Sequence, residues 1–86
     1  MKLYVGNLPY SVNDAELRGL FDAHGQVVSA SVAIDRETGR PRGFGFVEMA
    51  SPEEGRRAIE AMNNAQVGGR SLVVNEAKPR EDRGGG

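Results

Sequence analysis

The chain has 86 residues, no cysteine and a formal net charge of −1, with 11 lysines and arginines against 12 aspartates and glutamates. This length allows one domain with a modest core, and the lack of cysteine excludes disulfides and thiolate metal sites. No apolar run is long enough for a membrane span or for the core of a signal peptide, so we expect a cytoplasmic protein without a targeting segment.

The first predicted element is a strand that begins at Lys2. In residues 3–8 (LYVGNL), alternation places Leu3 and Val5 on the inner face of a sheet and Tyr4 on the outer face. An outward tyrosine can stack on a nucleic-acid base, although single tyrosines are also common on the solvent face of a strand.

A helix is predicted over residues 14–24. It begins at Asn13, whose spacing from Glu16 matches a capping box, and we expect it to end at Gly25. Apolar residues recur within it at spacings of three and four, which marks one buried helical face.

A second strand is predicted over residues 27–34, and a polar loop over residues 35–41 joins it to an antiparallel third strand. Alternation divides the side chains of the second strand between the two faces of the sheet. The inward residues are Val28, Ala30 and Val32, and the outward residues are Ser29, Ser31 and Ala33. The outer face would then be a flat patch of small residues.

The third strand, residues 42–49 (RGFGFVEM), is the most informative segment of the chain. Arg42, Phe44, Phe46 and Glu48 share one of its faces. A core face would not carry the two charges, and a plain solvated face would not carry two phenylalanines. Aromatic rings combined with a cation are typical of a surface that stacks bases and holds a phosphate.

A second helix is predicted over residues 52–62. Ser51 would be its N-cap, Pro52 occupies the first helical position, and Glu54 would complete a capping box. Small and apolar residues share one face of this helix as well, which predicts that it packs on the same sheet.

The last strand follows residues 63–69, where paired asparagines and paired glycines predict turns. Leu72 and Val74 would point inward from this strand, and Asn75 would point outward. The chain then becomes charged and ends in glycines, which predicts a disordered tail over residues 79–86.

Two of these segments resemble the motifs of a known family. Residues 42–49 fit the octamer of RNA-recognition motifs, Lys/Arg-Gly-Phe/Tyr-Gly/Ala-Phe-Val-x-Phe/Tyr, except that Met49 replaces the last aromatic residue. Residues 3–8 resemble the hexamer of the same family, in which the second position supplies a stacking aromatic ring. Residues 1–78 therefore look like one RNA-recognition domain of the small glycine-rich RNA-binding kind.

The resemblance implies an α+β fold, the ferredoxin-like β-α-β-β-α-β sandwich of two layers. In this fold a four-stranded antiparallel sheet is backed by two helices, and the two motif strands lie side by side in its middle. The same element order follows from the local signals alone, and two helices on one face leave the other face bare.

The resemblance also implies a monomeric binder of single-stranded RNA that needs no cofactor and stacks bases on the sheet. The biological role that the resemblance implies is RNA chaperoning or post-transcriptional regulation. The residues expected to contact RNA are Tyr4, Arg42, Phe44 and Phe46, together with Lys2, Asn75, Lys78 and Arg80 near the sheet edge.

The slightly acidic net charge argues against a nucleic-acid binder, since such proteins are often strongly basic. However, the predicted helices carry net charges of −2 and −1, which leaves +2 for the rest of the chain. If the helices cover the back of the sheet, its front is the more positive side. Stacking must then supply much of the affinity.

Three rival functions come from other classes. Single-stranded DNA would stack in the same way, because stacking does not detect the 2′-hydroxyl. A protein-interaction module can share the fold, but such domains usually lose the stacking aromatics. Catalysis of the acylphosphatase kind would need an arginine in the loop after the first strand, and residues 6–12 contain none. We therefore expect no enzyme activity.

Overall fold

The computed structural model describes residues 1–77, which fold into a four-stranded antiparallel sheet and two helices. The elements in chain order are β1 (Lys2–Gly6), α1 (Asp14–Asp22), β2 (Val27–Ile34), β3 (Pro41–Met49), α2 (Pro52–Met62), β4 (Gln66–Val67), β5 (Arg70–Ser71) and β6 (Val73–Glu76). The strand order in the sheet is β2-β3-β1-β6. The two motif strands, β1 and β3, therefore lie side by side in the middle, as predicted.

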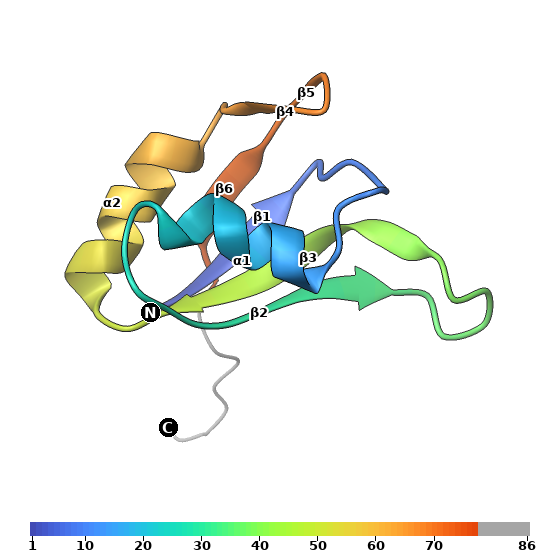
Figure 1. Cartoon of the computed structure of the whole chain (residues 1–86), viewed down its shortest axis with the longest axis horizontal. Coiled ribbons are helices and arrows are strands. Elements are labelled where there is room, and N and C mark those ends of the chain that lie inside the picture. Colours follow the sequence, from blue (N-terminus) through green and yellow to red (C-terminus); the bar gives the residue numbers. More distant parts are fainter. Residues whose placement is uncertain (78–86) are drawn as a thin grey trace.

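Both helices cover the same face of the sheet (Figure 1). Their buried residues, among them Leu17 and Phe21 of α1 and Ala58 of α2, belong to one core with the inward side chains of the strands. Leu3 and Val47 are fully buried in this core, and burying such a side chain contributes about 1.5–3 kcal/mol. The α+β sandwich expected from the sequence is confirmed, and the other face of the sheet has no helix on it.

The start of α1 matches the prediction. The backbone N–H of Glu16 donates to Oδ1 of Asn13 at 2.8 Å, and the N–H of Asn13 donates to Oε1 of Glu16 at 3.2 Å. The helix ends at Asp22, two residues earlier than expected, because the N–H of His24 bonds to the carbonyl of Phe21 and tightens the last turn.

The start of α2 matches the predicted capping box only in part. Oγ of Ser51 accepts the N–H of Glu54 at 3.2 Å, and Pro52 stands in the first turn. The prediction that the Glu54 side chain accepts the backbone N–H of Ser51, which would complete the capping box, is wrong. The Glu54 side chain lies against Gly25 instead, and its Oε1 is buried without a hydrogen-bond partner.

A bulge in β2 overturns one predicted orientation. Val27 pairs with Met49 and Ser29 pairs with Glu48, which leaves Val28 as an extra residue between two pairs. Val27 is therefore the buried residue at 3% exposure, whereas Val28, expected inward, is 54% exposed. Beyond the bulge, Ala30 and Val32 face the core as predicted.

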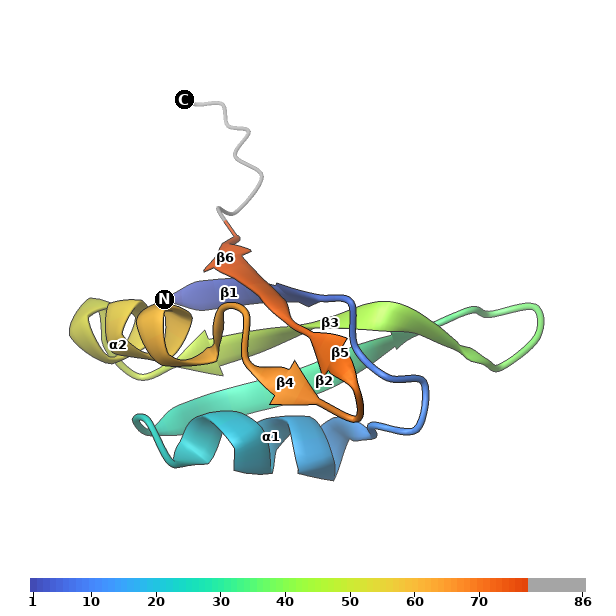
Figure 2. The ribbon, with the colours of Figure 1, turned by 90° about the horizontal axis from the view of Figure 1, so that it is seen from above.

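A small hairpin stands where the sequence predicted only turns. Its strands, β4 and β5, are joined by Gly68 and Gly69, both with positive φ, as in a type I′ turn. Nδ2 of Asn7 donates to the carbonyl of Ser71 at 2.8 Å, which fastens the hairpin beside the end of β1 (Figure 2). None of the helices in residues 1–77 is long and apolar enough to cross a membrane.

Candidate nucleic-acid interface

Three aromatic rings meet on the face of the sheet that the helices leave open. The centroids of Tyr4 and Phe44 are 5.8 Å apart, those of Tyr4 and Phe46 are 5.9 Å apart, and those of Phe44 and Phe46 are 6.0 Å apart. Each ring is half-buried. We call these three residues the aromatic platform. The rings lie against one another and stay partly exposed, so bases can stack on them.

The register of the central strands brings these rings together. Tyr4 of β1 pairs with Phe46 of β3, and Gly6 pairs with Phe44. Side chains that oppose one another on one face of antiparallel strands have Cβ atoms about 4.5–5.5 Å apart. The prediction that all three aromatic residues point away from the core is confirmed.

Because Gly6 has no side chain, the Tyr4 ring can pack flat against the sheet at this position. A Cβ atom at Gly6 would stand 2.7 Å from the Tyr4 hydroxyl oxygen and 2.9 Å from Cε2 of its ring. The Tyr4 ring therefore lies over the backbone of Gly6, which pairs with Phe44 on the neighbouring strand. A larger residue at this position would push the ring out of the platform.

Two cations flank the platform at opposite ends. Nζ of Lys2 lies 5.1 Å from the Phe46 centroid, and Cζ of Arg42 lies 5.6 Å from the Phe44 centroid. Both distances are within the reach of a cation–π contact, and both side chains are exposed. A strand of nucleic acid that crosses the platform would find a phosphate partner at either end.

The backbone of β3 bends at Gly43, next to Arg42. Gly43 has a φ of +87°, and its carbonyl accepts the N–H of Leu8 at 2.8 Å. This φ is strained for residues with a Cβ atom, so the octamer needs glycine here. Sequence reasoning missed the bend, although a glycine within a strand pattern is a known signal for one.

The remaining predicted site residues divide into two groups. Asn75 of β6 is exposed and pairs with Tyr4, so it borders the platform as predicted. Lys78 and Arg80 lie outside the described residues. Glu48, on the same face, is exposed and pairs with Lys2, which puts a carboxylate at the Lys2 end of the platform.

The loop after β1 and the β4–β5 hairpin contain none of the residues that were predicted to contact RNA. In the structure these two segments meet, and Cζ of Arg70 lies 5.5 Å from the centroid of the Tyr10 ring. The sequence offers no signal for this contact, because it depends on a hairpin that is 60 residues away. Within residues 1–77 no cluster of His, Cys, Asp or Glu could hold a metal ion.

Comparison with known proteins agrees with this geometry. The family model for the RNA recognition motif matches residues 3–73. The chain belongs to the RNA recognition motif family. The matched residues include both motif strands, β1 and β3.

Several relatives resemble this RNA recognition motif over most of its length. RbpB of Nostoc sp., provisionally named as an RNA-binding protein, is 55% identical over 99% of this chain and 82% of its own length. The 28 kDa chloroplastic ribonucleoprotein of Spinacia oleracea is 53% identical over 92% of this chain and 34% of its own.

Solved structures show the same likeness. The crystal structure of RNA-binding protein PG1 has a TM-score of 0.89 and 51% identity, and the match covers 95% of this chain and 99% of that one. A Sex-lethal protein–RNA complex has a TM-score of 0.82 and 40% identity, and the match covers 88% of this chain and 47% of that one.

Proposed function

We propose that this domain binds single-stranded RNA across the open face of its sheet. Bases stack on Tyr4, Phe44 and Phe46, while Lys2 and Arg42 hold phosphates at the two ends of the platform. The observation that carries the proposal is the cluster of three rings, all within 6.0 Å of one another, on a face without a helix. Unstacked bases laid on aromatic side chains are the usual mode of sequence-tolerant RNA recognition by such sheets.

The nature of the ligand follows from the mixture of groups on this face. A protein partner would favour a continuous apolar patch, but cations stand over two of the three rings. An anionic ligand with flat faces satisfies both kinds of group. The relatives support RNA over other such ligands, since one similar structure is a protein–RNA complex and another relative is named a ribonucleoprotein.

The biological role is the finer part of the proposal. A single domain with a few subsites fits RNA chaperoning or post-transcriptional regulation, in which many transcripts are bound weakly. Action as a monomer, a cytoplasmic location and the lack of catalysis stay predictions. Asn75, Lys78 and Arg80 also stay predictions as RNA contacts.

The test is the double variant Phe44→Ala with Phe46→Ala, titrated against a random-sequence single-stranded RNA by fluorescence anisotropy. Each lost stack is worth about 1–3 kcal/mol, so we expect binding to fall below detection. The control is Arg57→Ala, which removes a cation from α2 on the covered side of the sheet and should bind as the unmodified chain does.

Two further measurements keep the result interpretable. Thermal unfolding followed by circular dichroism should stay cooperative in the double variant, because the two rings lie outside the core. A DNA oligonucleotide of the same sequence measures how far the site prefers RNA. A folded double variant that binds RNA normally would refute the stacking site.

A further inference from the structure

Glu48 puts a negative charge on the face of the sheet that carries the aromatic platform. It is exposed and follows Phe46 by two residues on β3, so the two side chains share this face about 6–7 Å apart. The other acid in the four strands of the sheet, Glu76, pairs with the buried Leu3 and lies on the opposite face. Because a carboxylate repels phosphate, Glu48 cannot hold the RNA backbone as Lys2 and Arg42 do.

The register places Glu48 between two different neighbours. It pairs with Lys2 of β1 on one side and with Ser29 of β2 on the other, and both are exposed. The Lys2 ammonium lies 5.1 Å from the centroid of Phe46, so a phosphate is held on the β1 side of that ring. Ser29 is small, which leaves room on the β2 side. The polar edge of a base stacked on Phe46 can therefore reach Glu48.

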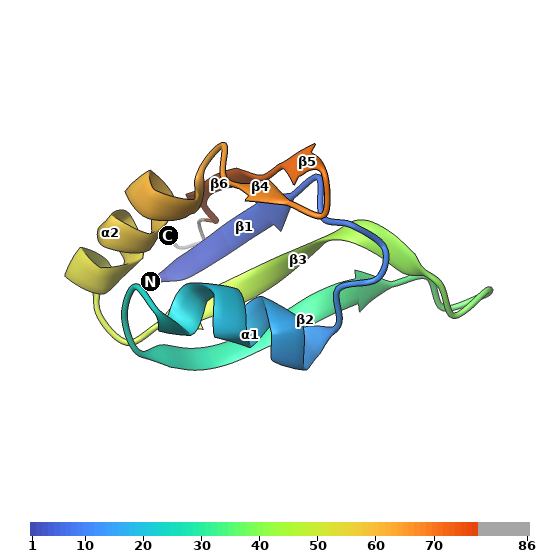
Figure 3. The ribbon, with the colours of Figure 1, turned by 45° about the horizontal axis from the view of Figure 1, so that its top comes forward.

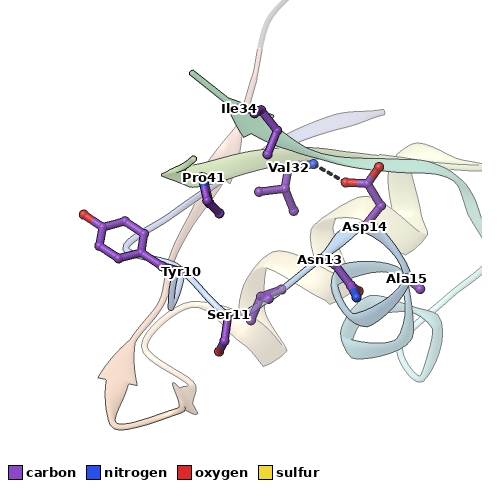
Figure 4. Close-up of a pocket in the computed structure, with 9 residues that line it drawn as sticks. Tyr10, Ser11, Asn13, Asp14, Ala15, Val32, Ile34 and Pro41 are labelled. Atoms are coloured by element: carbon purple, nitrogen blue, oxygen red, sulfur yellow. Dashed lines mark hydrogen bonds between the residues drawn. The ribbon is translucent and has the colours of Figure 1, made fainter. Parts of the chain in front are cut away.

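Strand β2 is held in place on the side of Glu48 away from Lys2. Helix α1 lies along this strand, as Figure 3 shows. Oδ1 of Asp14 accepts the backbone N–H of Val32 at 2.7 Å (Figure 4), and Nη2 of Arg18 donates to the carbonyl of Val27 at 3.1 Å. These bonds fix β2 on both sides of Ser29. A surface that is ordered before the ligand arrives loses little conformational entropy on binding.

The chemistry of a carboxylate distinguishes among the four bases. An ionised carboxylate only accepts hydrogen bonds, and its two oxygens can take two neighbouring donors. The Watson–Crick edge of guanine offers two such donors, N1–H and the N2 amino group. Adenine and cytosine offer one amino group beside a ring nitrogen that accepts, and uracil offers one N–H between two carbonyls. Of the four bases, guanine alone gives both oxygens a donor, and single-stranded RNA leaves this edge free.

We propose that Glu48 makes the platform prefer guanine, because its carboxylate accepts N1–H and N2–H of a guanine stacked on Phe46. This inference rests on the proposed RNA binding at the platform, and it names the base that one position of that site selects. It also gives a role to the one charge on this face that opposes RNA binding in general. Glu48 weakens the binding of bases that turn an acceptor toward it, and the difference is the preference.

The first test compares RNA oligomers on the unmodified chain by fluorescence anisotropy. One is an oligouridylate, and the other is the same oligomer with a single central guanosine. We expect the guanosine oligomer to bind about tenfold more tightly, within the range for one bidentate contact to a base. Inosine in the same place lacks the N2 amino group and should lose most of this gain. In 7-deazaguanosine the Watson–Crick edge is intact, so the gain should remain.

The second test removes the charge of Glu48 and keeps the shape of its side chain. We expect Glu48→Gln to bind the guanosine and uridine oligomers within about threefold of each other. The matched control is Glu60→Gln, which removes the same charge from an exposed position of α2 on the covered side of the sheet and should keep the tenfold preference. Thermal unfolding followed by circular dichroism checks that both variants fold.

The outcomes separate this inference from the proposed function. Equal binding of guanosine and uridine oligomers by the unmodified chain, or a preference that persists in Glu48→Gln, would overturn the role of Glu48 and leave RNA binding at the platform intact. The inosine comparison needs no variant, so equal binding of inosine and guanosine oligomers would overturn it as well. Failure of the unmodified chain to bind any of the oligomers would instead overturn the proposed function, and this inference with it.

Discussion

Neighbouring residues of β3 serve opposite faces of the sheet. Phe46 lies in the aromatic platform, whereas Val47 is fully buried in the core. This alternation allows a chain of 86 residues to hold a core and a binding surface on one sheet. The platform also stabilises the fold to some extent, because each aromatic pair contributes about 0.5–1.5 kcal/mol beyond the area that it buries.

Gly43 offers a test of the bent backbone at the residue scale. We expect Gly43→Ala to lower the free energy of unfolding by about 1–3 kcal/mol, because its φ of +87° is strained for alanine. The matched control is Gly19→Ala within α1, where a Cβ atom would meet nothing within 4 Å. That change should stabilise the protein by about 0.5–1 kcal/mol. Urea unfolding measures both, and equal effects of the two substitutions would contradict the assigned strain.

The aromatic residues of the platform could be predicted from the sequence, whereas the contact between Tyr10 and Arg70 could not. Phe44, Phe46 and Tyr4 lie in strands, where alternation alone decides which face a side chain occupies. Tyr10 lies in a loop, and its position depends on Arg70, which is distant in the sequence. Only the folded chain brings these two residues together.

At the scale of the element, the N-cap of α1 offers a test of how much one capping residue stabilises the fold. Asn13 satisfies a backbone N–H at the start of α1 and is exposed, so its role there is local. We expect Asn13→Ala to lower the free energy of unfolding by about 1 kcal/mol, as measured by urea denaturation. RNA affinity should not change, because α1 lies on the covered side of the sheet. A change in affinity without a change in stability would contradict this separation.

The sequence predicted the type and order of the main helices and strands better than it predicted side-chain orientation and short strands. Caps and periodicity are local signals, so both helices and the four strands of the sheet were predicted in the right order. The orientation of Val28 was wrong because a bulge shifts the register, and such a shift is decided by the pairing with β3 rather than within β2. The β4–β5 hairpin was missed because each of its strands has two residues, too few to show alternation.

At the scale of the whole molecule, all four strands of the sheet lie within residues 1–77. The last strand is complete at Glu76, and the N–H of Ala77 donates to the carbonyl of Lys2 at 2.8 Å. We expect a chain that ends at Ala77 to fold cooperatively and to bind RNA several-fold more weakly, through the loss of phosphate contacts from Lys78 and Arg80. One titration compares the two chains. Complete loss of binding would place the site in the C-terminal segment and make the platform secondary.

The salt dependence of binding reports how the whole surface divides its affinity between charge and stacking. The net charge is −1, and few cations flank the platform. About three phosphate contacts to a single strand give a slope of about −2 for log K against log salt, since each contact contributes about −0.7. Arg42→Ala should make the slope shallower by about 0.7, whereas Arg57→Ala on α2 should leave it unchanged. Anisotropy titrations over a range of salt concentrations measure these slopes. A slope several-fold steeper than −2 would mean that a basic surface away from the platform holds the RNA, and in that case Phe44→Ala would change the affinity far less than stacking requires.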